Sequence, residues 1–505
     1  MANSARPLLE YVGLLNQKNL IKKSNVNQAL MDSLIYNVTY NSKDVIPSTL
    51  FVCKGSHFKD EYLKEAISKG ATIYLSEEQR ATDIPDFPFI LVHDIRKTLA
   101  ELANLYYQEN WKALNLVGIT GTKGKSTTSY YVKNILDQYL LSENKPLSAI
   151  LSGIFNYDGI INEESHLTTP ETFELHQHFQ NAVESGISYL TMEVSSQALK
   201  YGRTEGICFD IGVFLNMGND HISEIEHQSY EDYRNSKLHL FSQCNIAVVN
   251  SNTHDFNLII AEAQDKAPKV LTFGVDEIAD ISAYDLLADD TGTTFKVSSS
   301  KYNGEFRVGM KGIFNVENAL AAIAVAHELD IPMDCVIKGL ENAKVPGRME
   351  VFYDKNRDIV IIVDYAHNQM SFQRLFETVQ IEYKDRPIHI VFGCPGYKAL
   401  GRRQELGEIA GKWSNMVYIT EEDSGEEPLE EISREIATYI QKANTKYDII
   451  NDREEAIKEA IARAPKNSIV LITGKGRETR QKRGSLYIDT PSDVQIVERI
   501  LTHEE

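Results

Sequence analysis

The chain has 505 residues, which is too long for a single hydrophobic core, so about three domains of roughly 150 residues are expected. With 42% hydrophobic and 25% charged residues, its composition is that of a folded globular protein and argues against a disordered or fibrous design. Its 52 basic and 72 acidic residues give a net charge of −20, which argues against general binding of nucleic acid or of anionic membranes.

The five cysteines are far apart in the sequence and no pair has metal-ligand spacing, which favours reduced thiols in a cytosolic protein. The start of the chain has no sustained apolar stretch, so no signal peptide is expected. The longest aliphatic runs, such as residues 359–363, have the length of a strand and not of a membrane span. We therefore expect a cytoplasmic protein that does not bind a membrane.

Apolar runs of strand length alternate with helical patterns along the whole chain. Residues 49–94 contain three such runs, and residues 95–108 have apolar positions at helical spacing. A strand at 114–119 leads into a Gly-rich turn and a helix, and further strands are expected at 189–194, 209–216 and 246–250. After residue 267, shorter alternating runs separated by turns predict a local antiparallel patch.

Strand and helix patterns alternate again from about residue 345, with strands in DIVIIVDYA, IHIVFGC, NMVYIT and SIVLITG. This alternation predicts βαβ units and mostly parallel sheets. We place domain boundaries near residue 111 and at Pro346-Gly347, which gives domains 1–110, 111–346 and 347–505. The expected fold is three α/β domains: a smaller N-terminal domain, a central parallel-sheet domain carrying the Gly-rich turn, and a Rossmann-like C-terminal domain.

The Gly-rich turn resembles a phosphate-binding P-loop. It consists of Gly121, Thr122, Lys123, Gly124, Lys125 and Ser126. Glycines let successive backbone N–H groups face phosphate oxygens, and the N-terminus of the following helix adds partial positive charge. Lys125 is expected to bridge the β- and γ-phosphates of ATP, and Ser126 to offer its hydroxyl to Mg²⁺. The usual pattern has glycine where this chain has Ile119, and the alternative is a purely structural turn.

Two further segments carry side chains suited to a ligand site. Glu193 and Ser195 lie at the end of a predicted strand, where open α/β sheets bind their ligands, although such an acid can also simply cap a helix. His221 and Lys237 lie in NDHISEIEHQSYEDYRNSKLHLF, and the alternative for them is a turn histidine and a solvated helix lysine. Each signal is weak alone.

Together, GITGTKGKS, MEVSSQ, NDH…YRNSKLHLF, GIFNVENALAA, VPGRME and VDYAHN occur in one order and resemble the Mur ligase family, the ATP-dependent amide ligases of peptidoglycan precursor synthesis. The resemblance covers nearly the whole chain. It is closest to the members that add the third residue of the peptide. It implies ligation of a diamino acid to the D-Glu side-chain carboxylate of UDP-N-acetylmuramoyl-L-Ala-D-Glu, through an acyl phosphate.

The resemblance also implies roles for individual residues. The catalytic centre would comprise Lys125, Glu193, His221 and Lys237. The Mg²⁺ ligands would be Ser126, Glu193, His221 and Lys237, the last carbamylated by CO₂. Beyond the P-loop, ATP would contact Asn315, Asn318, Arg348 and Asp364, with His367 in the same motif as Asp364. The UDP-muramoyl dipeptide and the incoming amino acid would contact Ser42, Thr168, Thr169, Ser195, Arg203, Ser424, Gly474 and Glu478.

The sequence departs from the family pattern in the last domain. Members that add meso-diaminopimelate carry a D-N-P-R motif whose arginine binds the distal carboxylate, whereas here Ser424 follows Glu421, Glu422 and Asp423. Loss of the guanidinium removes bidentate carboxylate recognition. The acidic cluster favours a cationic side chain, so L-lysine is the leading candidate. Ornithine, another amino acid, or a merely solvated acidic loop remain open. The basic candidates in the segment after residue 392 are Arg402 and Arg403.

Other functions are compatible with parts of the pattern. A ligase resembling folylpolyglutamate synthase is disfavoured because YNSKDV…LFVCKG resembles a UDP-sugar module. A non-catalytic nucleotide-binding regulator is disfavoured by the retained catalytic set, and a P-loop switch protein or kinase by the DYAH and LTTP segments. The expected partners are the UDP-muramoyl dipeptide and a free amino acid, with no nucleic acid and no membrane. A monomer is the default expectation, since the sequence says nothing about oligomeric state.

Overall fold

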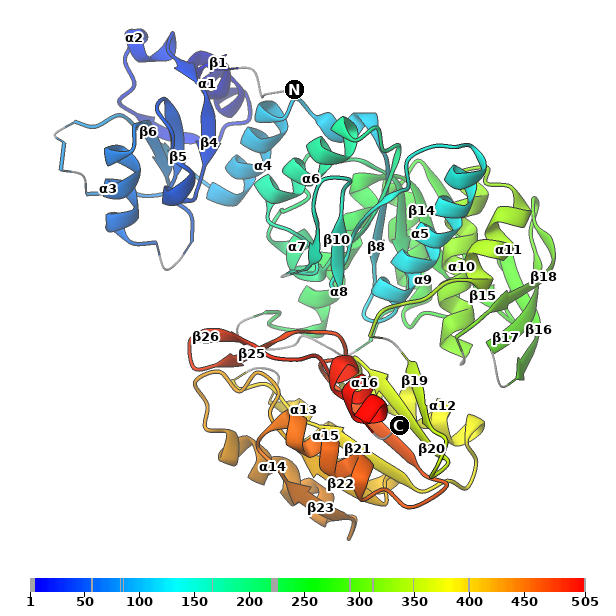
Figure 1. The fold of residues 1–505 in the computed structure, drawn as a ribbon. Coiled ribbons are helices and arrows are strands. Elements are labelled where there is room, and N and C mark those ends of the chain that lie inside the picture. The colour runs from blue at the N-terminus through cyan, green and yellow to red at the C-terminus, as the bar shows by residue number, and fades with distance from the viewer. Residues whose placement is uncertain are drawn as a thin grey trace.

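The computed structural model describes residues 5–55, 58–81, 83–84, 86–165, 167–218, 226–289, 292–310, 313–347, 349–397 and 400–503. Three bodies follow one another along the chain, each built around its own large sheet (Figure 1). The sheets use strands within residues 21–92, 115–308 and 350–473, so the domain boundaries near residues 111 and 346 remain our proposal for dividing the chain. The expected mixed α/β class is confirmed. Every helix within the described segments is too short or too polar to cross a membrane.

The N-terminal body is a five-stranded sheet with the order β2-β7-β6-β5-β4, parallel except for β2. Its elements are β1 (Arg6–Pro7), α1 (Leu8–Gln17), β2 (Ile21–Ser24), α2 (Gln28–Met31), β3 (Leu34–Ile35), β4 (Asn37–Thr39), β5 (Thr49–Val52), α3 (Asp60–Ser68), β6 (Ala71–Ser76), β7 (Phe89–Val92) and α4 (Ile95–Tyr106). The three strands and the helix expected from the sequence are confirmed as β5, β6, β7 and α4. Asp94 caps α4 by accepting backbone N–H groups of its first turn.

The central body is an eleven-stranded sheet with the order β11-β10-β9-β12-β8-β13-β14-β15-β16-β17-β18. Its strands are β8 (Asn115–Thr120), β9 (Ala149–Leu151), β10 (Phe155–Tyr157), β11 (Asn162–Glu164), β12 (Tyr189–Glu193), β13 (Phe209–Phe214), β14 (Cys244–Asn250), β15 (Lys269–Val275), β16 (Ile281–Asp289), β17 (Gly292–Ser298) and β18 (Asn303–Val308). Its helices are α5 (Lys125–Ser142), α6 (Thr172–Glu184), α7 (Ser196–Lys200), α8 (Tyr230–Leu238), α9 (Phe256–Lys266), α10 (Ile313–Glu328) and α11 (Met333–Glu341).

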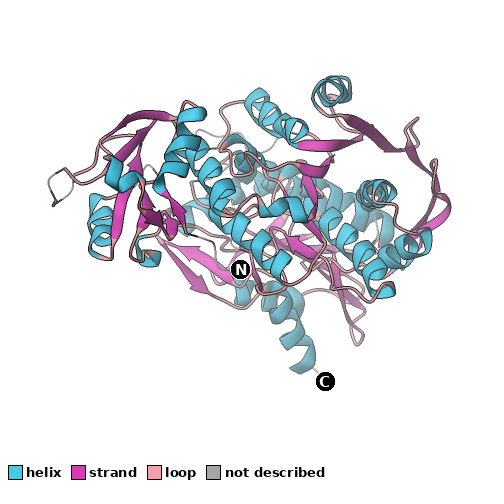
Figure 2. Ribbon diagram, turned by 90° about the horizontal axis from the view of Figure 1, so that it is seen from above, coloured by secondary structure: helices cyan, strands magenta, loops and turns pink. Residues whose placement is uncertain are grey.

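The strands from β9 to β16 in this order are parallel, and antiparallel hairpins extend both ends of the sheet. The antiparallel patch expected after residue 267 is confirmed for β16, β17 and β18. Helices lie on both sides of the strands (Figure 2). Strand β8 is therefore buried on both faces: Val117 and Ile119 belong to one apolar cluster and Leu116 to another. This double burial explains its nearly continuous apolar sequence.

The C-terminal body is a six-stranded sheet with the order β19-β20-β24-β21-β22-β23, parallel except for β19. Its elements are β19 (Glu350–Asp354), β20 (Ile359–Asp364), α12 (Gln369–Glu382), β21 (Ile388–Phe392), α13 (Gly401–Trp413), β22 (Met416–Ile419), α14 (Leu429–Gln441), β23 (Lys446–Ile449), α15 (Arg453–Ala462), β24 (Ile469–Thr473), β25 (Arg480–Arg483), β26 (Leu486–Asp489) and α16 (Asp493–His503). The four strands expected here are confirmed. The β25–β26 hairpin, which the sequence did not predict, extends from the side of this body that faces the central body (Figure 1).

Candidate active site

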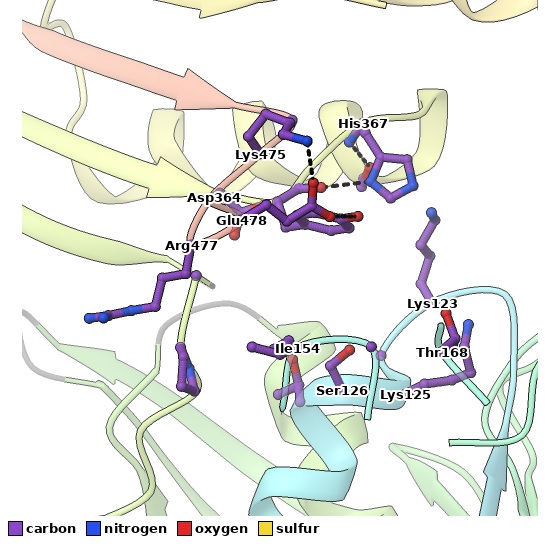
Figure 3. Close-up of a pocket in the computed structure, with 18 of the residues that line it drawn as sticks. Lys123, Lys125, Ser126, Ile154, Thr168, Asp364, His367, Lys475, Arg477 and Glu478 are labelled. Atoms are coloured by element: carbon purple, nitrogen blue, oxygen red, sulfur yellow. Dashed lines mark hydrogen bonds and ion pairs between the residues drawn. The ribbon is translucent and has the colours of Figure 1, made fainter. Parts of the chain in front are cut away.

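A cavity of about 880 Å³ is lined by residues of both the central and the C-terminal bodies. The P-loop forms one wall, and the C-terminal ends of β20 and β24 with the loops that follow them form the other (Figure 3). The residues singled out from the sequence that line it are Thr122, Lys123, Gly124, Lys125, Ser126, Thr168, Glu193, Asn315, Asn318, Asp364, His367, Arg402, Glu422, Asp423, Gly474 and Glu478. Those not among its lining residues are Ser42, Gly121, Thr169, Ser195, Arg203, Lys237, Arg403, Glu421 and Ser424. His221 and Arg348 lie outside the described residues.

The P-loop connects β8 to the first turn of α5. Gly124 caps the helix at a φ of 87°, in the left-handed region, and a Cβ there would overlap the side-chain oxygen of Asn318. Lys125 donates from Nζ to the carbonyl oxygens of Gly121 at 2.9 Å and of Thr122 at 3.4 Å. Ile119 is fully buried inside β8. The glycine missing from the motif therefore falls in the sheet core, before the turn begins.

Lys237 lies directly beside the P-loop. It is on α8 with 1% of its surface exposed, and its Nζ donates to the carbonyl oxygen of Gly121 at 3.0 Å. The Nζ also faces the ring of Tyr233 at 4.6 Å, and the Tyr233 hydroxyl donates to Thr122 Oγ1 at 3.2 Å. The alternative of a solvated helix lysine is wrong, because this amine is buried among P-loop atoms.

Glu193 ends β12 and is almost fully buried. Its Oε1 accepts the backbone N–H of Gly153 at 2.8 Å, whereas Oε2 receives no hydrogen bond from the described residues. It is Ser195, and not Glu193, that caps the following helix, by accepting the N–H of Ala198. The simple capping alternative for Glu193 is therefore wrong, and this carboxylate lines the cavity together with Ser126.

A carboxylate oxygen and a hydroxyl beside a phosphate-binding loop fit Mg²⁺, which takes one or two protein ligands and fills its octahedron with phosphate oxygens and water. The described residues contain no group of three or more His, Cys, Asp or Glu side chains that could hold a metal ion by itself. A magnesium site here would thus rely on the nucleotide for most of its ligands.

The residues expected around adenine and ribose lie on α10 and at the end of β20. Thr128 donates to Asn318 Oδ1 at 3.4 Å, and Asn318 donates to Asn315 Oδ1 at 3.5 Å. Asp364 accepts the N–H groups of Met349 at 2.9 Å and Ala366 at 2.7 Å. Asp364 thereby attaches the segment around Met349, which joins the two bodies, to the end of β20.

The residues expected to contact the muramoyl dipeptide lie between the main cavity and the N-terminal body. Thr169 Oγ1 accepts the N–H of Ser195 at 2.9 Å, and Arg203 donates to the carbonyl oxygen of Thr169 at 3.1 Å. Arg203 also pairs with Glu171 at 2.8 Å, and Glu171 binds Lys54 of the N-terminal body. This chain of contacts joins the central body to the body that carries Ser42.

Ser42 belongs to a short 3₁₀ turn in the N-terminal body, where it is buried and donates to Glu65 at 2.7 Å. Ser42 is therefore not among the residues that line the main cavity.

The acidic cluster of the last body is largely neutralised by basic residues of the same chain. Glu421 forms two hydrogen bonds with Arg483, at 2.8 and 2.5 Å, and Asp423 pairs with Lys475 at 3.2 Å. Glu422 has no ion pair among the described residues, and its buried Oε2 has no hydrogen-bond partner. Burial raises the pKa of Glu422 to about 8, although neighbouring basic groups oppose the shift. Of the three carboxylates, Glu422 alone is both unpaired and on the cavity wall.

Gly474 and Glu478 complete this wall. Gly474 has a φ of 108°, and a Cβ there would overlap the Glu422 carboxylate, so this position requires glycine. Glu478 pairs with Lys475 at 2.6 Å and accepts a hydrogen bond from the hydroxyl of Tyr365. Lys475 therefore links Glu478 to Asp423, and the Glu422 carboxylate lies beside Gly474.

The sequence patterns did not predict several residues that line the cavity. Lys475 and Tyr365 lie inside motifs that the sequence displays, GKGRE and DYAH, and that signal could have identified them. Glu164, which also lines the cavity, carries no recognisable sequence signal. Of the two basic candidates, Arg402 lines the cavity, whereas Arg403 is buried and pairs with Glu427 and Glu435, each at 2.7 Å.

Comparisons with known proteins agree along the whole chain. Residues 119–326 match the model of the Mur ligase middle domain, and residues 347–476 match that of the Mur ligase glutamate ligase domain. The chain is 36% identical to the UDP-N-acetylmuramoyl-L-alanyl-D-glutamate–L-lysine ligase of Streptococcus thermophilus, over 92% of both chains. It is 35% identical to the corresponding 2,6-diaminopimelate ligase of Clostridioides difficile, over 90% of this chain and 92% of that one.

Among solved structures, a UDP-N-acetylmuramoyl-L-alanyl-D-glutamate–2,6-diaminopimelate ligase superposes with a TM-score of 0.66 at 24% identity, over 99% of this chain and 100% of that one. The fold similarity extends over all three bodies.

Proposed function

The chain belongs to the Mur ligase family, and we propose that it joins L-lysine to the D-Glu side-chain carboxylate of UDP-N-acetylmuramoyl-L-Ala-D-Glu. It is an ATP-dependent ligase of peptidoglycan synthesis. The observation that carries the proposed reaction is the cavity that places the P-loop opposite Glu422 and the Lys475–Glu478 ion pair.

The central wall suits phosphoryl transfer from ATP. Lys125 is part of the loop that would surround the β- and γ-phosphates, and its Nζ donates a hydrogen bond to the Gly121 carbonyl oxygen. Transfer of the γ-phosphoryl group to the D-Glu carboxylate gives an acyl phosphate, and the cationic Lys125 offsets the charge that builds up on the phosphoryl oxygens. Mg²⁺ held by Glu193 and Ser126 would supply further neutralisation of that charge.

The second half-reaction is attack by the uncharged amine of the incoming amino acid on the acyl carbon. The tetrahedral intermediate then collapses and expels inorganic phosphate. An acyl phosphate is also attacked by water, so the two bodies that enclose the cavity protect it by limiting access of solvent. The Glu478 carboxylate, fixed by Tyr365 and Lys475, is suited to hold the α-ammonium group of the bound amino acid.

The preference for lysine rests on Glu422. Lys475 and Arg483 neutralise the two neighbouring carboxylates, so Glu422 is the wall group left to receive a cationic side chain. A diamino acid with a distal carboxylate would instead place negative charge beside Glu422. The relatives include both lysine and diaminopimelate ligases at similar identity, so the lysine preference is argued from this wall.

We further propose that Lys237 is carbamylated by CO₂ in the active enzyme. The modification would convert a buried cation beside the P-loop into an anionic oxygen group of the kind that Mg²⁺ prefers. We expect Lys237→Ala to lower kcat by about 100-fold, and short-chain carboxylic acids to restore part of the loss by replacing the missing carboxylate. Lys266→Ala, an exposed helical lysine, is the matched control. Full activity of Lys237→Ala, or a loss that no acid restores, would contradict this role.

The reaction class is tested by phosphate release from ATP. We expect release that depends on both UDP-muramoyl dipeptide and lysine, and none with folate and glutamate. Folate-dependent release would instead establish the folylpolyglutamate synthase alternative. Equal ATP turnover by wild type and Lys237→Ala, without peptide product, would indicate a nucleotide-binding regulator.

A further inference from the structure

Glu164 joins the central body to the C-terminal body at the edge of the cavity. It is the last residue of β11, the edge strand of the eleven-stranded sheet. Its carboxylate accepts the backbone N–H of Thr479 at 3.2 Å and the Thr479 hydroxyl at 2.5 Å. The two residues are 315 positions apart in the sequence, and both line the cavity.

Thr479 lies between Glu478 and the β25–β26 hairpin on the C-terminal wall. It directly follows Glu478, and the β25–β26 hairpin begins at the next residue. Its own carbonyl oxygen accepts the N–H of Thr490 at 2.8 Å, which closes the base of the hairpin. A carboxylate that binds both the amide and the hydroxyl of Thr479 therefore fixes the backbone adjacent to Glu478.

We propose that Glu164 is a positioning residue that completes the amino-acid subsite only when the C-terminal body is closed on the central body. The proposal rests on the proposed function, because it takes Glu478 as the ligand of the incoming amino acid. Glu164 acts through Thr479: two charge-assisted hydrogen bonds hold the loop in the orientation in which Glu478 faces the cavity. Without these hydrogen bonds, the hairpin and the preceding loop would be more mobile. Binding of the amino acid would then have to order them, which weakens the binding.

The expected kinetic effect is selective. Glu164→Ala should raise KM for the amino acid about tenfold and change KM for ATP less than about twofold, because the two hydrogen bonds of Glu164 go to Thr479, which directly follows Glu478. Thr479→Val keeps the amide donor but loses the hydroxyl, so a smaller rise of about threefold is expected. Thr479→Ser keeps both donors and should behave as wild type. Glu163→Ala removes the exposed carboxylate of the preceding residue and is the matched control.

A double-mutant cycle tests whether Glu164 acts through Thr479. If it does, Glu164→Ala with Thr479→Val should raise KM for the amino acid about tenfold, as the Glu164 change does alone. Independent roles would multiply to about thirtyfold, and that result would overturn the proposal.

Hydrogen–deuterium exchange of the full-length enzyme tests the Glu164–Thr479 contact independently of the ligase reaction. Peptides covering residues 476–490 should exchange faster in Glu164→Ala than in wild type or Glu163→Ala, while peptides from β24 remain unchanged. Unchanged exchange at 476–490 would overturn the proposal even if wild type ligates lysine. Failure of wild type to ligate any amino acid would instead contradict the proposed function, and the exchange result would still report whether Glu164 holds the loop.

Discussion

The two walls of the cavity are built in different ways. The P-loop wall is a contiguous segment, residues 121–126, whose lysine and backbone groups are set by one turn between β8 and α5. The opposite wall is built from side chains far apart in the sequence, such as Glu421 with Arg483 and Asp423 with Lys475. Under the proposed function, phosphate would be recognised by local backbone geometry, and the amino acid by the carboxylate that remains unpaired after the other charges have neutralised one another.

We expect the two walls to respond differently to substitution. On the P-loop side, Ile119 stands in place of the usual glycine at a position that lies in the sheet core, before the turn begins. On the C-terminal side, we expect a change in one ion pair to alter which carboxylate is left unpaired. Under the proposed function, selectivity for the amino acid would depend on ion pairs more than on a continuous motif.

The strongest expected effect is on the P-loop wall. Lys125→Ala should lower kcat/KM for ATP by about 10³-fold, because it removes the cation expected on the transferred phosphoryl group. Steady-state phosphate release measures it, with Lys145→Ala, an exposed lysine beyond the end of α5, as the control. A decrease of less than tenfold would show that this wall does not depend on its lysine.

Placing glycine at position 119, as in the usual P-loop pattern, should destabilise the protein. Ile119 is fully buried in β8, so Ile119→Gly removes a packed side chain and adds backbone freedom, for a loss of about 4 kcal/mol in the free energy of unfolding. Urea unfolding followed by circular dichroism measures this. Unchanged stability together with tighter ATP binding would mean that position 119 belongs to the phosphate loop after all.

The opposite wall is tested by Glu422→Gln, which should raise KM for lysine about tenfold at pH 8.5 and leave KM for ATP unchanged. Because the pKa of Glu422 is raised to about 8, its carboxylate is largely protonated below that pH. KM for lysine should therefore fall in wild type as pH rises from 6.5 to 8.5. Any pH dependence that persists in Glu422→Gln belongs to the amine of the substrate.

The raised pKa of Glu422 also predicts how the free energy of unfolding changes with pH. The folded-state pKa of Glu422 lies above the usual value of 4.5, so the unfolded chain ionises first and the free energy of unfolding falls as pH rises from about 5 to about 8. Glu422→Gln should remove this contribution to the slope, whereas Glu426→Gln, an exposed neighbour, should keep it. Parallel slopes for wild type and Glu422→Gln would show that Glu422 is already ionised when buried.

Much of the P-loop side could be predicted from the sequence because local patterns determine it. The strand at β8, the turn and the helix α5 follow from apolar periodicity and glycine spacing within about 30 residues. Lys237 could be assigned only through the family resemblance, since its burial against Gly121 depends on how α8 packs beneath the loop. Its own sequence favoured a solvated lysine.

The C-terminal wall could be predicted only in part. The sequence displayed three adjacent acids but not that Arg483 and Lys475 neutralise two of them, because those partners are 62 and 52 positions away. Glu164 was invisible for the same reason: its role depends on the approach of two separately folded bodies. Edge strand β19 and the β25–β26 hairpin were also missed, since their short mixed-polarity runs lack a clear period.

The most direct test is an amino-acid panel with purified wild-type enzyme, ATP and UDP-N-acetylmuramoyl-L-Ala-D-Glu, followed by detection of the ligated peptide. We predict that lysine is ligated with a kcat/KM at least tenfold above that of meso-diaminopimelate, since Glu422 lines the cavity without an ion pair and is proposed to receive the distal group of the amino acid. Efficient ligation of diaminopimelate with no product from lysine would contradict the account of this wall.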